Sequence, residues 1–257
     1  MGTLLEVRRL SLSFGGIRAL VGVDVSLAEG ETLAVIGPNG SGKTSLFNCI
    51  TGIYRPDSGV ITFAGESLLG RSPDGVTRRG VARTFQNLRL FHNMSVLDNL
   101  LLGRHRHFRR RFFDALFRRR GEEIRHRRKC EELIDFLKLQ DLRKQPTASL
   151  AYGLRKRVEL GRALAVEPKV LLLDEPMGGM NQDEKEDMAR YVLDVNQERG
   201  VTVVLIEHDM GVVMDISDTV IVLDRGRRIA AGTPEEVQRH PAVIEAYLGA
   251  GKNGGRA

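Results

Sequence analysis

The chain has 257 residues, 42% of them hydrophobic and 28% charged, which suits one compact α/β unit or a core with a subdomain. Its longest apolar runs, at 170–173 and 203–206, fall far short of the ~20 residues that cross a bilayer, so we expect no membrane span. The two cysteines, Cys49 and Cys130, lack C-x-x-C spacing, which indicates free thiols in a reducing compartment and excludes a disulfide framework.

The net charge of +6 is concentrated in one stretch. Residues 104–129 hold twelve arginines and lysines against three acids. Three interpretations stay open for this stretch: contact with nucleic acid, attraction to anionic lipid headgroups, or a solvated helical face. The charges alone favour the solvated face.

The N-terminal part alternates apolar and polar residues at 4–12 and 21–27, which predicts two antiparallel strands divided by a turn at Gly15 and Gly16. A strand, a glycine-rich loop and a helix follow in TLAVIGPNGSGKTSLFNCITG, and GVITFAG and GVARTFQ predict further strands. From about 87 to 166 the pattern becomes helical and basic.

Strands and helices alternate in the rest of the chain. The segments KVLLLDEP, VTVVLIEHD and TVIVLDRG predict apolar strands, with helices between them. This alternation predicts a parallel sheet covered on both faces. We therefore predict a discontinuous α/β core over 1–86 and 167–248, an inserted helical subdomain over 87–166, and a flexible glycine-rich tail over 249–257.

Residues 37–44, GPNGSGKT, match the phosphate-binding pattern G-x-x-x-x-G-K-[ST] between a predicted strand and a predicted helix. The glycines let the backbone wrap phosphates closely, so that its N–H groups and the positive helix end face the anion. Lys43 is expected to reach the β- and γ-phosphates, and the Thr44 hydroxyl to ligate Mg²⁺. A chance glycine-rich turn is the weaker alternative. The loop residues predicted to bind ATP are Gly37, Pro38, Asn39, Gly40, Ser41, Gly42, Lys43, Thr44 and Ser45.

Two adjacent acids follow the predicted strand at 170–174. We predict that Asp174 holds Mg²⁺ through water and that Glu175 polarises the attacking water as general base. Strands also end in acids simply because the rim of a sheet is polar. Pairing with the phosphate-binding loop makes the catalytic interpretation the stronger one.

Two further polar residues follow predicted strands. Gln86, after GVARTF, is predicted to ligate Mg²⁺ and orient water, although a single glutamine in this position is more often an ordinary loop residue. His208 follows a strand 33 positions after Glu175 and is predicted to contact the γ-phosphate. A lone histidine is usually structural, so its place after a core strand carries the prediction.

The order of these motifs, with LAYGLRKRVELGRAL between Gln86 and Asp174, resembles the ATP-binding subunit of an ABC transporter. The segments RTFQNLRLF, IEHDMGVVMDISD and GTPEEVQRHPAVIEAYLG look like the branched-chain amino acid importer ATPases, the LivG-like group. The resemblance implies an α/β P-loop NTPase core of the RecA-like kind, with an antiparallel β-edge and an inserted α-helical subdomain. It implies ATP and Mg²⁺ as cofactors, and ATP hydrolysis that powers uptake of branched-chain amino acids or a related small polar or carboxylic solute.

The resemblance also implies head-to-tail dimers, in which each ATP lies between one P-loop and the signature element of the other subunit. That element corresponds here to Ala151, Tyr152, Gly153 and Leu154. Phe14 lies where the family places an aromatic side chain on adenine; the alternative is that it only packs at a strand end.

The partners implied by the family are a second homologous ATPase subunit, two transmembrane permease subunits and an external solute-binding protein. A heterodimer of ATPase subunits is the first expectation and a homodimer the second. The chain would be peripheral, on the cytoplasmic face of the bacterial plasma membrane. The basic stretch would then lie near anionic lipid, whereas no aromatic or recognition motif supports nucleic-acid binding.

The signature element departs from the usual L-S-G-G-Q pattern. Ala151 takes the place of serine and Leu154 that of glutamine, whereas Tyr152 matches the LivG-like pattern. We expect an altered but functional half-site, and therefore two unequal ATP sites. Two other function classes compete: a soluble ABC-type ATPase that acts on nucleic acid or the ribosome, and a non-ABC P-loop kinase, which leaves LAYGL and His208 without a role.

Overall fold

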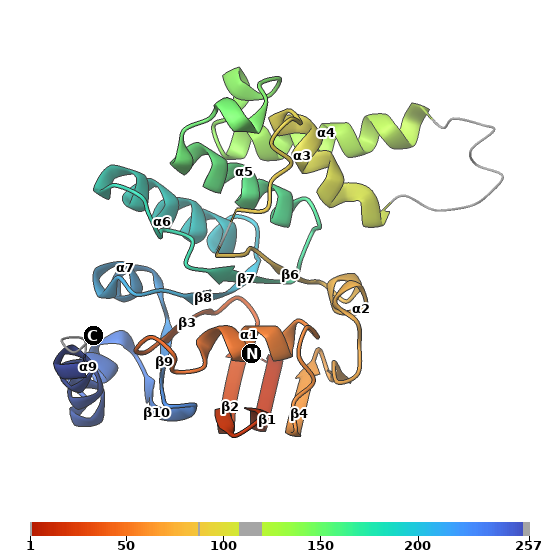
Figure 1. Cartoon of the computed structure of the whole chain (residues 1–257). Helices are drawn as coiled ribbons and strands as arrows, with labels where there is room; N and C mark the ends of the chain where they lie inside the picture. The colour runs from red at the N-terminus through yellow and green to blue at the C-terminus, as the bar shows by residue number, and fades with distance from the viewer. Residues whose placement is uncertain (1, 87, 108–119, 254–257) are drawn as a thin grey trace.

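The computed structural model describes residues 2–86, 88–107 and 120–253. They form two sheets with a layer of helices above them (Figure 1). The larger sheet has six strands. Five of them run parallel to one another, and one strand at the edge runs antiparallel. Its strand order is β10 (Arg227–Gly232), β9 (Thr219–Asp224), β3 (Thr32–Ile36), β8 (Thr202–Ile206), β7 (Val170–Asp174) and β6 (Val81–Arg83).

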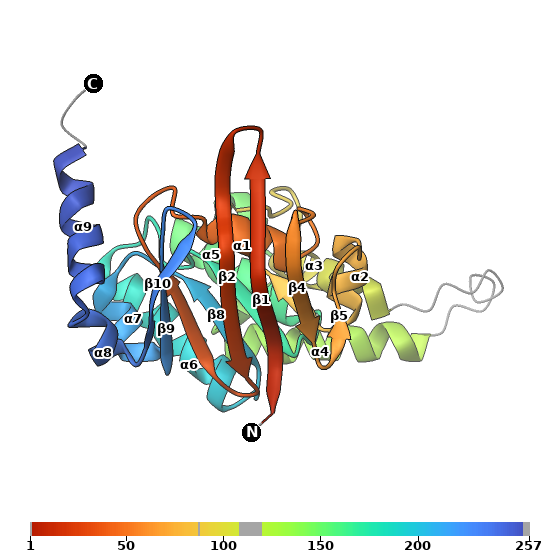
Figure 2. The ribbon, with the colours of Figure 1, turned by 90° about the horizontal axis from the view of Figure 1, so that it is seen from below.

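The smaller sheet is antiparallel and lies across the foot of the molecule, where its long hairpin is seen in Figure 2. The hairpin turns at Gly15 and Gly16, as the sequence predicts. The strand order is β2 (Ile17–Ala28), β1 (Thr3–Phe14), β4 (Ser58–Phe63) and β5 (Glu66–Ser67). The predicted parallel sheet with an antiparallel β-edge is thus confirmed.

The central strands β3, β7 and β8 are buried along their whole length, which explains their unbroken apolar sequences. Successive side chains of a strand face opposite sides of the sheet. Val170 and Leu172 therefore join the core shared with the antiparallel sheet, while Leu171 and Leu173 join a second core on the other face. The first core also holds α1 (Lys43–Ile50).

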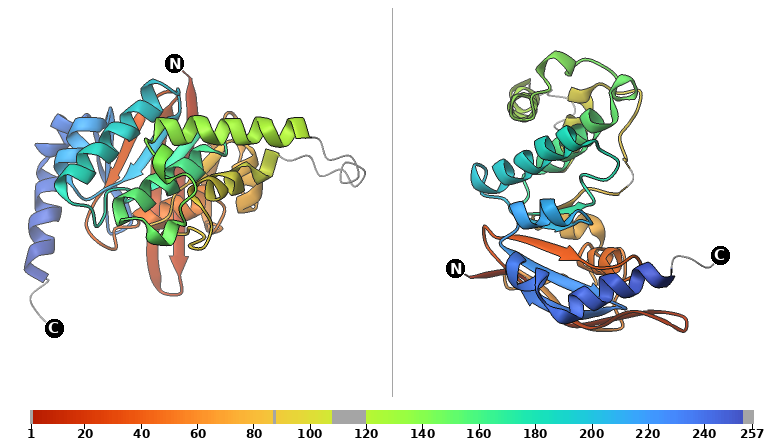
Figure 3. Two further views of the ribbon diagram at one scale, coloured as in Figure 1. Left: turned by 90° about the horizontal axis from the view of Figure 1, so that it is seen from above. Right: turned by 90° about the vertical axis from the view of Figure 1, so that its left-hand side faces the viewer.

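The second core continues upward into a helical lobe, which Figure 3 shows standing above the sheets. Leu100, Ile134 and Leu160 belong to this core and come from three different helices of the lobe. The elements of the lobe are α3 (Val96–Gly103), the short helix Arg104–His107, α4 (Arg120–Phe136), the turns Gln140–Leu142 and Thr147–Ser149, and α5 (Tyr152–Leu164).

The remaining helices are α2 (Pro73–Arg78), α6 (Gln182–Gln197), α7 (Met210–Ile216), α8 (Pro234–Gln238) and α9 (Pro241–Asn253). Helix α9 corrects the predicted tail, because it extends five residues into 249–257. Val243 is buried and Tyr247 packs against the core, so the helix is fixed before its glycines begin. Residues 254–257 lie outside the described part.

Three expectations from composition concern the cysteines, a membrane span and the basic stretch. Cys49 and Cys130 are buried free thiols, and burial raises the pKa of each to about 11. Within the described ranges, no helix is both long and apolar enough to cross a membrane. Of the basic stretch, residues 108–119 lie outside those ranges. Arg104 is buried and pairs with Glu167 at 3.0 Å, so this member of the stretch serves the fold.

Candidate ATP-binding site

The phosphate-binding loop joins β3 to α1 and needs glycine at two positions. Gly37 and Gly42 have φ angles of 143° and 106°, in the left-handed region. A Cβ on Gly37 would lie 2.0 Å from the Leu223 carbonyl oxygen, and one on Gly42 would lie 2.6 Å from the Ala19 carbonyl oxygen. Because both obstacles are backbone atoms, neither position has room for a side chain.

Lys43 begins α1, and its side chain turns back into the loop. Its buried Nζ donates hydrogen bonds to the carbonyl oxygens of Gly37 (2.7 Å) and Pro38 (3.0 Å). Burial lowers the pKa of Lys43, and the nearby carboxylates of Glu175 and Asp174 oppose that shift. The loop therefore holds a cation at its centre, where a phosphate would need it.

A cavity of about 460 Å³ opens in front of the loop. Its walls contain loop residues 39–45 together with Gln86, Glu175 and His208, which the sequence predicts as site residues from four separate segments. They meet because each follows a parallel strand, and parallel strands end at the same edge of the sheet. Residues 17–19 of β2 also line the cavity, and no motif in the sequence had indicated them.

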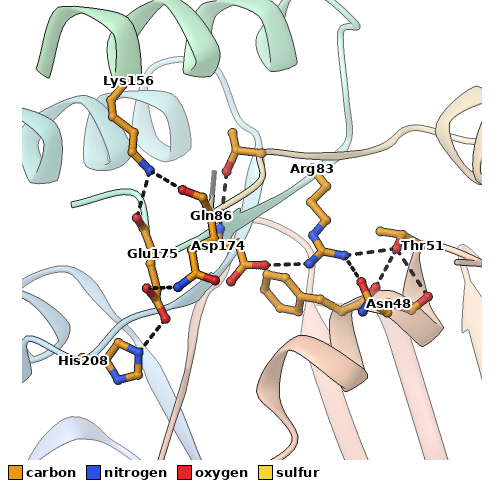
Figure 4. Close-up of polar contacts among 10 residues, drawn as sticks. Asn48, Thr51, Arg83, Gln86, Lys156, Asp174, Glu175 and His208 are labelled. Atoms are coloured by element: carbon orange, nitrogen blue, oxygen red, sulfur yellow. Dashed lines mark hydrogen bonds and ion pairs between the residues drawn. The ribbon is translucent and has the colours of Figure 1, made fainter. Parts of the chain in front are cut away.

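Glu175 lies at the centre of a hydrogen-bonded group (Figure 4). His208 Nε2 lies 2.6 Å from one carboxylate oxygen of Glu175, and Gln86 Nε2 donates to the other at 2.8 Å. Glu175 has a φ of 50°, a left-handed conformation that costs a non-glycine residue about 1–3 kcal/mol. Its N–H donates to the Ile206 carbonyl of β8 at 3.0 Å, and this hydrogen bond holds the conformation. The carboxylate is therefore held between the amide and the imidazole.

Asp174 is almost fully buried and makes a salt bridge that the sequence did not predict. Its Oδ2 accepts from Arg83 at 2.6 Å, and Arg83 in turn donates to Asn48 Oδ1 at 2.6 Å. The Arg83 guanidinium lies near the rings of Phe47 and Phe85. The only sequence signal was an arginine inside the predicted strand GVARTF, where a buried charge requires a partner.

The donor atoms near Asp174 suit a hard divalent cation. Among the described residues, the second carboxylate oxygen of Asp174 is buried without a hydrogen-bond partner. The exposed Thr44 and Gln86 line the cavity and supply a hydroxyl and an amide. No group of three or more His, Cys, Asp or Glu residues in the described ranges could hold a metal alone. Oxygen donors that are completed by substrate phosphates fit Mg²⁺.

Glu207 is a second buried acid that the sequence did not single out. Its carboxylate accepts hydrogen bonds from the N–H groups of Met177 (3.0 Å) and His208 (3.1 Å). Burial raises the pKa of Glu207, and these two bonds oppose the shift. Glu207 thereby fixes the backbone of His208 relative to the loop that follows Glu175.

Phe14 lies at the end of β1 and is 46% exposed. Its ring packs edge-on against Tyr54, with 5.1 Å between centroids. The described residues of the cavity wall include Ile17 and Arg18 but not Phe14. Both interpretations of Phe14 therefore stay open, because the ring is packed and still has a free face.

The signature-like residues lie apart from this cavity, at the start of α5 in the helical lobe. Ala151 precedes the helix and supplies no side-chain cap, while Tyr152 lies beside Gly179. A Cβ on Gly153 would lie 2.4 Å from a carboxylate oxygen of Glu184. Leu154 packs against the second core, which explains why an apolar side chain is tolerated there. The described cavity wall contains none of these four residues.

A glycine-rich phosphate loop, an acid pair at the end of a buried strand, and a separate helical lobe with a signature-like turn define an ATP-binding cassette. Comparison with known proteins identifies its family. The ABC transporter family matches residues 20–178, and a family described as branched-chain amino acid ATP-binding cassette transporter matches residues 227–253. The chain belongs to the ABC transporter family and is an ATPase of that family.

Individual relatives match over nearly the whole chain. The high-affinity branched-chain amino acid transport ATP-binding protein BraF of Pseudomonas aeruginosa is 41% identical, over 96% of this chain and 98% of its own. LivG of Escherichia coli is 38% identical over the same shares of both chains. A crystal structure of an ATP-binding cassette in its ADP conformation superposes with a TM-score of 0.86 at 32% identity and covers 97% of this chain and 100% of that chain. The predicted family and fold class are confirmed.

Proposed function

We propose that this chain powers an importer for branched-chain amino acids or a related small polar or carboxylic solute. The observation that carries the proposal is the convergence of the P-loop, Gln86, Glu175 and His208 on one cavity, in a chain whose relatives carry branched-chain amino acid transport in their names. Nothing in the sequence comparisons favours the alternative that acts on nucleic acid or the ribosome.

In this proposal the loop residues 37–45 hold the phosphates of ATP, and Lys43 neutralises their charge. Glu175 accepts the proton of the attacking water as general base, while His208 and Gln86 hold its carboxylate in place. Both contacts on Glu175 support this role, because each leaves the carboxylate at the cavity wall. Thr44, Gln86 and Asp174 would hold Mg²⁺, which spreads the charge of the leaving phosphates when bound.

A second cavity, of about 360 Å³, supports docking of a permease. It lies between the two lobes, because Thr77 and Arg83 of the core and Gly103, Glu159 and Arg162 of the helical lobe all line it. Phe91, in the segment between β6 and α3, is a large apolar side chain that is 57% exposed. We propose that a short helix of one permease subunit docks here, with this chain peripheral on the cytoplasmic face of the membrane.

The relatives are components of transporter complexes, and ABC cassettes form dimers. We propose that this chain forms a heterodimer with a second ATPase subunit. We propose that the complex also contains two permease subunits and an external solute-binding protein. The separation of Ala151, Tyr152, Gly153 and Leu154 from the chain's own cavity supports a role for them in the partner's site. We also propose that the basic stretch 104–129, part of which lies outside the described residues, contacts anionic lipid.

The test is uptake of radiolabelled leucine by the complex reconstituted in vesicles, with ATP hydrolysis measured in the same preparation. Glu175→Gln keeps the size of the side chain but removes the base, so we expect ATP binding to persist while turnover falls about 10²- to 10⁴-fold. Glu235→Gln, on an exposed face of α8, is the matched control.

Hydrolysis at the normal rate by Glu175→Gln in the assembled complex would remove Glu175 as the base. Failure of the wild-type complex to take up leucine, together with uptake of another carboxylic solute, would narrow the solute class. Co-purification of this chain with ribosomes instead of permease subunits, from detergent-solubilised cells, would overturn the transport proposal.

A further inference from the structure

Lys156 is a buried lysine at which three separate segments meet. It lies one turn into α5, four residues after Tyr152, and is only 4% exposed. Its Nζ donates hydrogen bonds to the carbonyl oxygens of Gln86 and Glu175, each at 3.3 Å (Figure 4). One ammonium group of the helical lobe therefore contacts both residues that form the amide–carboxylate pair of the ATP cavity.

A lysine is a costly choice for simple packing at this position. Burial of an ammonium group disfavours its charged form and lowers the pKa of Lys156, and the carboxylates of Glu159, Glu207, Glu175 and Asp174 oppose that shift. An apolar side chain would fill the same space without that cost. What the lysine adds is two hydrogen bonds to backbone carbonyls of the candidate site.

These bonds act on a residue whose backbone is strained. Glu175 adopts its left-handed conformation with its N–H bonded to the Ile206 carbonyl on one side and its own carbonyl bonded to Lys156 on the other. The same ammonium holds the backbone of Gln86, whose side chain donates to the Glu175 carboxylate. Loss of Lys156 would remove one hydrogen bond from the backbone carbonyl of each residue and leave the Glu175 carbonyl with the Gly178 N–H at 3.2 Å.

Lys156 is also connected to the signature-like turn. Its Nζ lies 5.9 Å from the centre of the Tyr152 ring, and Tyr152 lies beside Gly179 in the loop that follows Glu175. We infer that Lys156 is a positioning residue that transmits the position of α5, set by the partner's nucleotide, to Glu175 and Gln86 of its own chain. This inference rests on the proposed role of Glu175 as general base.

The competing explanation is that Lys156 merely attaches the helical lobe to the core. The neighbouring Arg157 provides a matched control for attachment, because it bonds Asp187 and Tyr191 of α6 from the same helix turn and touches neither Gln86 nor Glu175 in the contacts described. Lys156→Met keeps the length and apolar stem of the side chain and removes its donors. Lys156→Arg keeps the charge and restores donors.

The first readout is steady-state ATP hydrolysis by the assembled complex. For Lys156→Met we expect kcat to fall about ten- to hundredfold, the effect of a small misplacement of a catalytic group, with the KM for ATP within about twofold of wild type. Lys156→Arg should recover most of kcat. Arg157→Met should keep both constants near wild type. Equal losses in Lys156→Met and Arg157→Met would show attachment only and overturn the inference.

The second readout does not depend on turnover. Hydrogen exchange is followed in the assembled complex with and without the non-hydrolysable analogue AMP-PNP and Mg²⁺. In the wild type and in Arg157→Met, the peptides around 152–156 and 173–177 should both become protected by the analogue. In Lys156→Met, protection of 173–177 should be lost while that of 152–156 persists. Unchanged protection of 173–177 in Lys156→Met would overturn the inference.

Failure of the inference can be distinguished from failure of the proposed function. If Glu175→Gln is inactive but Lys156→Met turns over normally, the positioning role is wrong and the role of Glu175 stands. If Glu175→Gln turns over normally, the role of Glu175 and this inference are both wrong. If Lys156→Met does not fold, Lys156→Gln, which shortens the reach of the donor, is measured against the same outcomes.

Discussion

The phosphate-binding loop and the signature-like turn both carry glycine at the start of a helix, yet their surroundings differ. In the loop, the atoms that exclude a side chain at Gly37 and Gly42 are backbone carbonyls. In the turn, the atom that excludes one at Gly153 is the end of the flexible Glu184 side chain, and Ala151 leaves the helix start without a side-chain cap. The loop is therefore limited by backbone atoms of its own chain, whereas the turn is limited by the end of a side chain that can move.

The difference predicts that the signature-like turn tolerates substitution better than the phosphate-binding loop does. The phosphate-binding loop faces Glu175, Gln86 and His208 of the same chain, so a change of its backbone would disturb a complete group. The signature-like turn faces none of them, and Leu154 instead packs into the lobe. Departures from a family pattern are thus expected first where the motif serves another subunit.

The largest effect should come from breaking the support beneath the ATP cavity. Arg83→Met removes the cation that pairs with buried Asp174, and an uncompensated buried charge costs about 3–5 kcal/mol. We expect that loss in the free energy of unfolding, measured by urea denaturation. Arg79→Met is the control, because it breaks an exposed pair with Glu66 and should cost at most about 1 kcal/mol.

An equal and small loss in the two arginine variants would mean that Asp174 does not depend on Arg83. The ATP cavity would then be no more firmly supported than the signature-like turn. That result would contradict the difference in support between the phosphate-binding loop and the signature-like turn.

The smallest effect should come from repairing the signature-like turn. Ala151 occupies the position before α5 in an extended conformation, where a serine hydroxyl accepts a free N–H of the first helical turn. Ala151→Ser should therefore stabilise the chain by about 1 kcal/mol, or a rise in Tm of about 2–4 °C. Calorimetry measures this against Ala148→Ser, an exposed position outside the helix start. No rise relative to that control would mean that the turn is already capped by other means.

Sequence reasoning predicted what depends on local pattern. The loop at 37–44 and the acids Asp174 and Glu175 follow from motif spacing and strand ends, and parallel strands bring such ends together whatever the details of packing. The antiparallel hairpin followed from alternation and a glycine pair. These features need only the chain's own periodicity.

The residues that sequence reasoning missed are those whose roles depend on where another element lies. Lys156 is one of three basic residues in LRKR, and nothing in the sequence distinguishes it from its half-buried neighbours Arg155 and Arg157. Arg83 has its role because Asp174 and Asn48 lie on either side of it. The continuation of α9 to Asn253 depends on the packing of Tyr247, which glycine content does not reveal.

The central claim is that the ATP cavity and the signature-like turn of this chain serve two different nucleotides. Electron cryomicroscopy of the assembled complex that carries Glu175→Gln, prepared with ATP and Mg²⁺, tests it most directly. We expect one nucleotide on residues 37–45 of this chain, and the backbone of Ala151 to Leu154 against the γ-phosphate of a second nucleotide held by the partner ATPase. A structure in which Ala151 to Leu154 contact the nucleotide bound by their own chain, or face solvent while both sites are filled, would contradict it.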